Sequence, residues 1–377
     1  MPTSGGRRSF ATMDDHAPPT SLTSAQRALA DRFLSGEPRA LARCISLVEN
    51  QVPGFENLLH ALHEGVGRAR RVGITGPPGA GKSTLTASLA RLYRDRGERV
   101  GVIAVDPSSP FTGGALLGDR VRMDDLTTEP DIFIRSMASR GSQGGLATTT
   151  REAADLMDAF GFDRILLETV GVGQSELEVA SSADTTVVVL VPESGDGIQA
   201  MKAGLMEIAD LFVVNKADRP GADRLKKEIE VVQALRSGSG RQSTRAHHGV
   251  DLSSLGRKSV RRGSGGDPES ETGWLAPVRK CIASRGEGVP ELAAMMDRHF
   301  AWLERSGRLA ARRRQSALEH ARRVLERAVQ RHAARLWDEW SREEGSDPDL
   351  NLESPYSLGQ RLFASLLPSA EPGAGET

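Results

Sequence analysis

Short apolar runs alternate with amphipathic stretches through the middle of the chain. The apolar runs are rich in Val, Ile and Leu, and about ten to twenty residues of helical character separate most of them. Strands that are apolar on both faces and joined by helices are typical of a parallel sheet covered on both sides, so we expect an α/β fold with a mainly parallel sheet. The expected strands are Val72–Gly76, Val100–Asp106, Ile132–Ser136, Arg164–Thr169, Thr186–Pro192, Leu211–Asn215 and the strand-like Leu275–Ile282, and the expected helices are Ser83–Arg96, Ala147–Phe160, Ile198–Ala209 and one after Asn215.

The two ends of the chain follow a helical period instead. Apolar positions recur at helical spacing between Ser24 and Glu64, which predicts two or three short helices. Toward the C-terminus the pattern predicts helices over Leu292–Leu303, Ala310–Trp340 and Leu358–Leu366. We therefore divide the chain into a disordered leader at 1–20, an N-terminal helical extension at 21–66, a central domain at 67–305 and a C-terminal helical arm and tail at 306–377.

Residues 237–273 interrupt the central pattern. They are rich in Ser, Gly and Arg and carry few apolar side chains. A loop of this length is uncommon in a compact domain, so we expect a surface insertion. The alternative is a basic docking segment through Arg257, Lys258, Arg261 and Arg262. The Arg-rich part of the C-terminal arm is expected to be a solvated helix face rather than a nucleic-acid site.

The composition narrows the class of protein. Lys and Arg number 49 and Asp and Glu 50, so with a net charge of −1 no overall field draws the chain to nucleic acid or to an anionic membrane. No apolar run approaches the roughly 18 residues of a spanning helix, and residues 1–19 hold no apolar core of signal-peptide length. Cys44 and Cys281 lie too far apart in sequence for a disulfide framework or a metal knuckle. We expect a soluble, cytoplasmic protein that binds neither nucleic acid nor membrane.

A glycine-rich segment after the first expected strand carries the clearest chemistry. Residues 76–83 read Gly-Pro-Pro-Gly-Ala-Gly-Lys-Ser and fit G-x-x-x-x-G-K-[ST], a loop whose backbone N–H groups converge on phosphate at a helix N-terminus. Lys82 can reach the β- and γ-phosphates, and the Ser83 hydroxyl can ligate Mg²⁺. We predict that the nucleotide is bound by Gly76, Pro77, Pro78, Gly79, Ala80, Gly81, Lys82, Ser83 and Thr84.

A second motif indicates which base the nucleotide carries. Asn215-Lys216-Ala217-Asp218 follows an apolar strand. The carboxylate of Asp218 can accept from the N1–H and the amino group of guanine, whereas adenine has no proton on N1 and no N2 amino group. We therefore predict that GTP and GDP are bound, with Asn215, Lys216 and Asp218 at the base.

Acidic residues at strand ends are candidates for the metal. Glu168 ends one expected strand and can hold Mg²⁺ directly or through water. Asp106 ends the neighbouring strand, and Asp119 follows in the next loop; each is a candidate for metal contact or for positioning water. Gly171 can give its N–H to the γ-phosphate. We predict Lys82, Asp106, Asp119 and Gly171 as catalytic residues, and Ser83, Asp106, Asp119 and Glu168 as metal ligands.

Three longer strings resemble the MeaB/ArgK family of P-loop GTPases, whose human relative is the methylmalonic aciduria type A protein. They are Ala-Val-Asp-Pro-Ser-Ser-Pro at 104–110, Leu-Leu-Gly-Asp-Arg-Val-Arg-Met at 116–123 and Glu-Thr-Val-Gly-Val-Gly-Gln-Ser-Glu at 168–176. The resemblance covers about residues 25–367 and is weakest in the insertion. It implies a P-loop GTPase domain at 67–305 between helical extensions.

The resemblance also implies a partner. Members of the family chaperone adenosylcobalamin-dependent acyl-CoA mutases, of which methylmalonyl-CoA mutase is the commonest, and gate the loading of a cofactor that belongs to the mutase. They are typically homodimers, which implies a dimerising role for the C-terminal arm. Residues 192–204 look like the family's third switch, which couples nucleotide state to the mutase, and Lys202 falls on the lysine that the family carries there.

The chain departs from the family pattern at the base. The guanine-base loop usually carries Ser-Ala, whereas this chain reads Cys281-Ile282-Ala283. We expect the Ala283 N–H still to reach guanine O6, with Ile282 loosening the affinity for the base. The motif usually read R-G-x-L-G-G appears as Arg-Gly-Ser-Gln-Gly-Gly at 140–145.

Two other kinds of GTPase are alternatives. Nickel-delivery maturation GTPases carry a His-rich tract or a Cys near the P-loop, but the sole adjacent pair among the 8 His here is His247-His248. Targeting GTPases add a Met-rich helical domain, whereas the 9 Met here are scattered. Neither a water-orienting glutamine nor an arginine finger can be assigned, so we predict slow basal hydrolysis that a partner stimulates.

Overall fold

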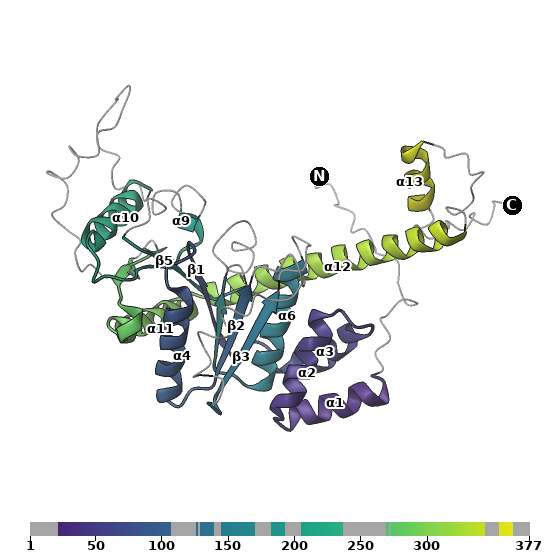
Figure 1. The fold of residues 1–377 in the computed structure, drawn as a ribbon, viewed down its shortest axis with the longest axis horizontal. Coiled ribbons are helices and arrows are strands. Elements are labelled where there is room, and N and C mark those ends of the chain that lie inside the picture. The colour runs from purple at the N-terminus through teal and green to yellow at the C-terminus, as the bar shows by residue number, and fades with distance from the viewer. Residues whose placement is uncertain are drawn as a thin grey trace, which may run out of the picture. The chain divides into compact units, whose positions relative to one another are not determined.

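Seven strands form the main sheet, and each overlaps an apolar run predicted from the sequence (Figure 1). The computed structural model describes residues 22–106, 126, 129–138, 145–169, 182–192, 205–236, 269–270, 273–343 and 354–364. The strands are β1 (Arg70–Thr75), β2 (Val100–Asp106), β3 (Ile132–Ala138), β4 (Arg164–Glu168), β5 (Thr185–Leu190), β6 (Leu211–Val214) and β9 (Val278–Lys280).

The order of the strands brings the predicted site residues to one edge. The sheet runs β3-β2-β4-β1-β5-β6-β9, and each pair of neighbouring strands is parallel. The carboxyl ends of parallel strands lie at the same edge, so the segments after β1, β4, β6 and β9 are neighbours there. A crevice at this edge is where open α/β sheets bind ligands.

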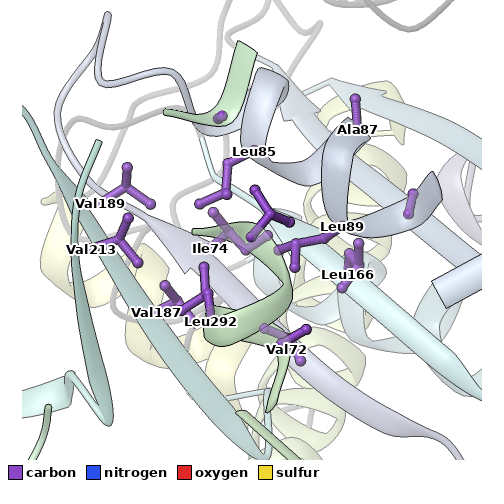
Figure 2. Packing of buried hydrophobic residues seen from close by; sticks show 14 of the residues in the cluster. Val72, Ile74, Leu85, Ala87, Leu89, Leu166, Val187, Val189, Val213 and Leu292 are labelled. Carbon is purple, nitrogen blue, oxygen red and sulfur yellow. The ribbon is translucent and has the colours of Figure 1, made fainter. Parts of the chain in front are cut away.

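Helices cover both faces of the sheet, as predicted. One face packs against α4 (Lys82–Asp95) and α11 (Val289–Arg305), and Figure 2 shows Leu85 and Leu89 of α4 and Leu292 of α11 among strand residues such as Val187. The other face packs against α6 (Gly145–Phe160), α10 (Ala222–Arg236) and the short α9 (Leu205–Ile208). Successive strand residues alternate between the two faces, which is why the runs are apolar throughout.

The N-terminal helices share their core with the sheet. They are α1 (Ser24–Leu34), α2 (Pro38–Glu49), α3 (Phe55–Leu62) and the 3₁₀ turn η1 (His63–Gly65). Thr23 and Gln26 form a capping box at the start of α1. The apolar side chains of α1, α2 and α3 join those of α6, β2 and β4 in one buried cluster. Arg135 of β3 adds an ion pair with Glu49 of α2.

The C-terminal part is helical. The chain divides into a compact unit at Met1–Ala310 and a second at Ala311–Thr377. The long α12 (Arg308–Glu343) and α13 (Pro355–Ala364) account for the described residues of the second unit. No helix within the described ranges is both long and apolar enough to cross a bilayer.

Some predicted boundaries were wrong. The run Leu275–Ile282 is a strand only over Val278–Lys280, since Pro277 has no N–H for a ladder. Of the helix predicted at Ile198–Ala209, Leu205–Ile208 is helical, Ala209 lies beyond its end and 198–204 lie outside the described residues. At the end of the predicted insertion, β7 (Glu269–Ser270) pairs antiparallel with β8 (Gly273–Trp274), while residues 237–268 and 271–272 lie outside the described residues.

Candidate functional site

The loop between β1 and α4 has the backbone of a phosphate cradle. Gly76, Gly79 and Gly81 all have positive φ, at 139°, 75° and 85°. A Cβ on Gly76 would lie 2.0 Å from the carbonyl oxygen of Val189 on the adjacent β5, so no other residue fits there. Gly81 is the N-cap of α4, which therefore begins at Lys82. The loop thus opens directly onto a helix N-terminus, where N–H groups and the helix dipole favour an anion.

Lys82 lies over the loop that it follows. Its Nζ donates to the carbonyl oxygen of Gly76 at 2.9 Å and to that of Pro77 at 3.2 Å, and the side chain is buried. A buried ammonium needs compensation by acceptors or opposite charge. The arrangement holds a positive charge at the mouth of the cradle, where the phosphates of a nucleotide would lie.

Ser83 and Glu168 bring oxygen ligands together beside the cradle. The Ser83 hydroxyl donates to Oε1 of Glu168 at 2.6 Å, and both residues are buried. Their elements, α4 and β4, meet here because β4 pairs with β1. A hydroxyl and a carboxylate are the hard oxygen ligands that Mg²⁺ prefers, so the residues fit this ion. Within the described ranges, no group of three or more His, Cys, Asp and Glu side chains is placed to hold a metal.

Asn215 joins the phosphate cradle to the segment after β9. Its amide Nδ2 donates to the carbonyl oxygen of Ala80 at 2.8 Å, and its Oδ1 accepts from the N–H of Ala283 at 3.1 Å. The side chain is buried, and Gly81 is favoured here because its φ is 85° and a Cβ would lie 2.4 Å from Nδ2 and displace the Asn215 amide. One amide therefore connects the two segments that the sequence assigned to opposite ends of a nucleotide.

Lys216 and Asp218 face the same edge. Lys216 adopts a left-handed backbone with φ of 54°, which is rare for a residue with a side chain, and its Nζ donates to the carbonyl oxygen of Gly79 at 2.8 Å. Backbone strain of this kind clusters at binding sites. The carboxylate of Asp218 is 39% exposed and is therefore accessible to a base; Arg285 lies 3.5 Å from its Oδ2.

The segment Cys281–Ala283 is held from several sides. The N–H of Cys281 donates to the carbonyl of Val214 at 2.9 Å, and its own carbonyl accepts from Ala217 at 3.1 Å. Burial, reinforced by the charge of Glu291, raises the pKa of the Cys281 thiol to about 12. The thiol is therefore protonated at neutral pH and donates to the carbonyl of Gly288 at 3.2 Å. Ser88 of α4 donates to the carbonyl of Ala283 at 2.8 Å.

The structure brings most of the predicted site residues together, but several lie beyond what it describes. The loop 76–84, Glu168, Asn215–Asp218 and Ala283 meet at the carboxyl edge of the sheet. The backbone of Asp106 ends β2 at this edge, while its side chain is not described. Asp119, Gly171 and the predicted third switch with Lys202 lie outside the described residues.

Sequence reasoning missed two residues of this site, Ser88 and Arg285. Ser88 follows the nucleotide-binding motif by one helical turn, and Arg285 follows the base loop. Only their proximity in three dimensions connects them with Ala283 and Asp218. No local pattern signals such contacts, although the helical period does place Ser88 on the same face as Thr84.

Comparisons with known proteins agree with this geometry. A putative GTPase of Pyrococcus abyssi is 45% identical over 297 residues, which are 79% of this chain and 83% of that protein. A mitochondrial methylmalonic aciduria type A homolog of Mus musculus is 34% identical over 322 residues, covering 80% of this chain and 70% of that protein. The solved structure of a LAO/AO transport system kinase matches with a TM-score of 0.59 at 28% identity, covering 92% of this chain and 99% of that one.

A family model gives the assignment. The model described as methylmalonyl-CoA mutase-associated GTPase MeaB matches residues 41–336, which include both core faces of the sheet and every residue of the site. This match confirms the resemblance read from the strings at 104–110, 116–123 and 168–176. The chain belongs to the MeaB family of GTPases.

Proposed function

We propose that this chain binds and hydrolyses GTP at the carboxyl edge of its sheet. The observation that carries the proposal is the bridge made by Asn215, which joins Ala80 of the phosphate cradle to Ala283 of the base loop. Asp218 lies three residues beyond Asn215 with an accessible carboxylate. The relatives named as GTPases support the same activity.

The phosphate end is assigned to Lys82, Ser83 and Glu168. Lys82 would balance the charge of the β- and γ-phosphates from its place over the loop. Ser83 and Glu168 would hold Mg²⁺, which, when bound, offsets charge on the phosphate oxygens. We retain Asp106 and Asp119 as candidates for the metal or for positioning water, and Gly171 as a donor to the γ-phosphate.

The base end is assigned to Asp218 and the loop at Ala283. The two oxygens of the Asp218 carboxylate, whose side chain is 39% exposed, match the two adjacent donors on guanine, and adenine would leave the carboxylate without partners. The Ala283 N–H donates to Asn215 here. Our prediction that this N–H reaches guanine O6 therefore requires it to be shared or released when a nucleotide binds.

We further propose that the GTPase acts in the cytoplasm as a chaperone of a cobalamin-dependent acyl-CoA mutase, with methylmalonyl-CoA mutase as the first candidate. The description of the family model and the name of the mouse relative support this partner. The adenosylcobalamin belongs to the mutase. The family assignment also favours this function over nickel delivery, the alternative from the sequence.

Homodimerisation through α12 is part of the proposal. Leu318, Leu325 and Val329 are 64%, 64% and 52% exposed on this helix. Their spacing of seven and four residues puts them on one face within about 40° of each other. An apolar stripe with this spacing is typical of a helix that packs against a second helix.

Paired hydrolysis assays test the chaperone proposal. We expect low GTP turnover for the protein alone and a clear stimulation by purified methylmalonyl-CoA mutase. Lys202→Ala should lower the stimulated rate far more than the basal rate. The matched control is Lys226→Ala on the surface of α10, which should change neither rate. Absence of stimulation by any acyl-CoA mutase would contradict the chaperone role and leave the GTPase assignment intact.

A further inference from the structure

The base loop of this chain has no hydroxyl at the position before Ala283; its own serine, Ser284, follows Ala283. The position before Ala283 is Ile282, whose aliphatic side chain can neither donate nor accept a hydrogen bond. A loop that must present N–H groups to a base needs other support. The neighbouring helix α4 supplies a hydroxyl from outside the loop.

We infer that Ser88 is a positioning residue for base recognition. Its Oγ donates to the carbonyl oxygen of Ala283 at 2.8 Å, a contact between residues 195 positions apart in sequence. Ala283 is 3% exposed. Its N–H is held by Asn215 at 3.1 Å, so the two polar backbone groups of this residue are both fixed by side chains.

The contact makes one rigid element serve both ends of the nucleotide. α4 begins at Lys82 and Ser83, which we assign to the phosphates, and Ser88 lies on the same helix. Ala283 is therefore fixed relative to the phosphate cradle through its carbonyl and Ser88 of α4, and separately through its N–H, Asn215 and Ala80. A group that is held before the ligand arrives costs less to order on binding.

Ser88 has a competing acceptor within its own helix. Its Oγ also lies 2.9 Å from the carbonyl oxygen of Thr84. A hydroxyl carries one proton, so the two acceptors share it. Bonding back to the fourth preceding carbonyl is common for serine in helices and adds little stability. The bond to Ala283 is the one that connects separate elements.

The inference rests on the proposed binding of guanine nucleotides, and base analogues provide its test. We expect Ser88→Ala to weaken GDP binding about three- to tenfold, the size of one neutral hydrogen bond. IDP keeps O6 and lacks the N2 amino group, so its affinity should fall by the same factor. ADP lacks O6 and binds through ribose and phosphates, so its weak affinity, measured at millimolar concentration, should change less than about twofold. The measurement is competition against a fluorescent GDP derivative.

Two variants separate positioning from a general loss of structure. Ser88→Thr keeps the hydroxyl and should retain the GDP affinity of the native chain. Ser46→Ala on α2 removes a helical serine that also donates to the fourth preceding carbonyl, that of Ala42 at 3.0 Å, and that accepts from Arg135 at 3.2 Å. This variant should leave the affinity for GDP unchanged.

The outcomes distinguish this inference from the proposed function. Equal GDP affinity of Ser88→Ala and the native chain would overturn the role of Ser88 alone. An equal loss for GDP, IDP and ADP would also overturn it, because the defect would then lie in the whole site. A native chain that binds no GDP would overturn the proposed function and this inference together.

Discussion

Asp218 is the residue from which the choice of base follows. It lies three positions after the buried Asn215, and its carboxylate is an accessible acidic group beside the base loop. We predict that Asp218→Asn weakens GTP binding by about 2–4 kcal/mol, because two donors of guanine lose their acceptor. Xanthine nucleotides carry an oxygen in place of the amino group and should bind this variant better than the native chain. Titration calorimetry with both nucleotides measures this change in base preference, and an unchanged GTP affinity of Asp218→Asn would contradict the prediction.

Lys82 is the residue that the phosphate chemistry depends on. In the structure its ammonium is held by two carbonyl oxygens of the loop, at 2.9 and 3.2 Å. Lys82→Ala removes that charge without removing a strand or helix. We expect GTP hydrolysis to fall below detection while the far-UV circular dichroism stays native. Turnover comparable to the native protein would show that this loop does not serve as the catalytic cradle.

Where a local motif carries the candidate residues, prediction from sequence identified side chains that the structure brings together, while their roles in binding and catalysis stay predictions. The spacing of Gly76, Gly81 and Lys82 specifies the cradle, because each glycine meets a steric demand of an adjacent segment. Prediction from sequence missed Ser88, whose partner Ala283 is distant in sequence. It also missed Arg285, whose partner Asp218 lies on another loop. Such contacts depend on how α4 and the base loop pack together, and the hydrophobic periodicity of the sequence does not predict that packing.

At the scale of elements, a buried ionic network ties α6 to β1. The carboxylate of Asp158 on α6 accepts from the N–H groups of Gly67 and Ala69 at 2.9 and 2.8 Å and from the guanidinium of Arg71 at 2.8 Å. Burial raises the pKa of Asp158, but the Arg71 charge and these N–H donors outweigh it, and the pKa is lowered overall. The carboxylate is therefore ionised wherever the fold is intact near neutral pH.

We predict that Asp158→Ala destabilises the protein by about 3–5 kcal/mol, because it leaves the buried Arg71 charge without one of its partners. The control Asp95→Ala removes an exposed partner of Arg94 and should destabilise the protein far less, because exposed ion pairs add little to stability. Urea unfolding followed by circular dichroism measures both. A loss for Asp158→Ala no larger than that of the control would show that the network does not stabilise the junction.

The same network predicts how stability depends on pH. Because the folded pKa of Asp158 lies below its unfolded value of about 3.9, its contribution is complete above that value and is lost as the pH falls through the folded pKa. Asp158→Asn should therefore narrow the stability difference between pH 6 and pH 3 relative to the native chain. Urea midpoints at the two pH values measure it, and an identical difference in both proteins would contradict the assignment.

The elements themselves were more predictable than the contacts between them. Val100–Asp106 matches β2 residue for residue, because a strand buried on both faces is a continuous apolar run. The predicted ends of strands were less reliable. Leu275–Ile282 looks like one strand, yet Pro277 restricts it to Val278–Lys280. The sequence did not predict the Arg71–Asp158 network, since a buried arginine at the start of a strand has no sequence signature.

At the scale of the whole molecule, the proposal of a homodimer depends on the exposed stripe of α12. Leu325→Glu puts a charge in the middle of that stripe and should shift the protein from dimer to monomer. The control Ala334→Glu lies nine residues along, on the opposite face of the helix at about 180°. Light scattering coupled to size-exclusion chromatography gives the mass of each variant. A native chain that is monomeric, or a dimeric Leu325→Glu, would contradict dimerisation through α12.

The central claim is that the carboxyl edge of the sheet recognises a guanine nucleotide, and a titration of the native chain tests it most directly. Isothermal calorimetry with GDP and with ADP, both in the presence of Mg²⁺, compares nucleotides that differ only in the base. We predict saturable binding of GDP and at least about a hundredfold weaker binding of ADP, because adenine leaves the carboxylate of Asp218 without its donors. Equal affinities for the two nucleotides would contradict the assignment of Asp218 and the base loop to guanine.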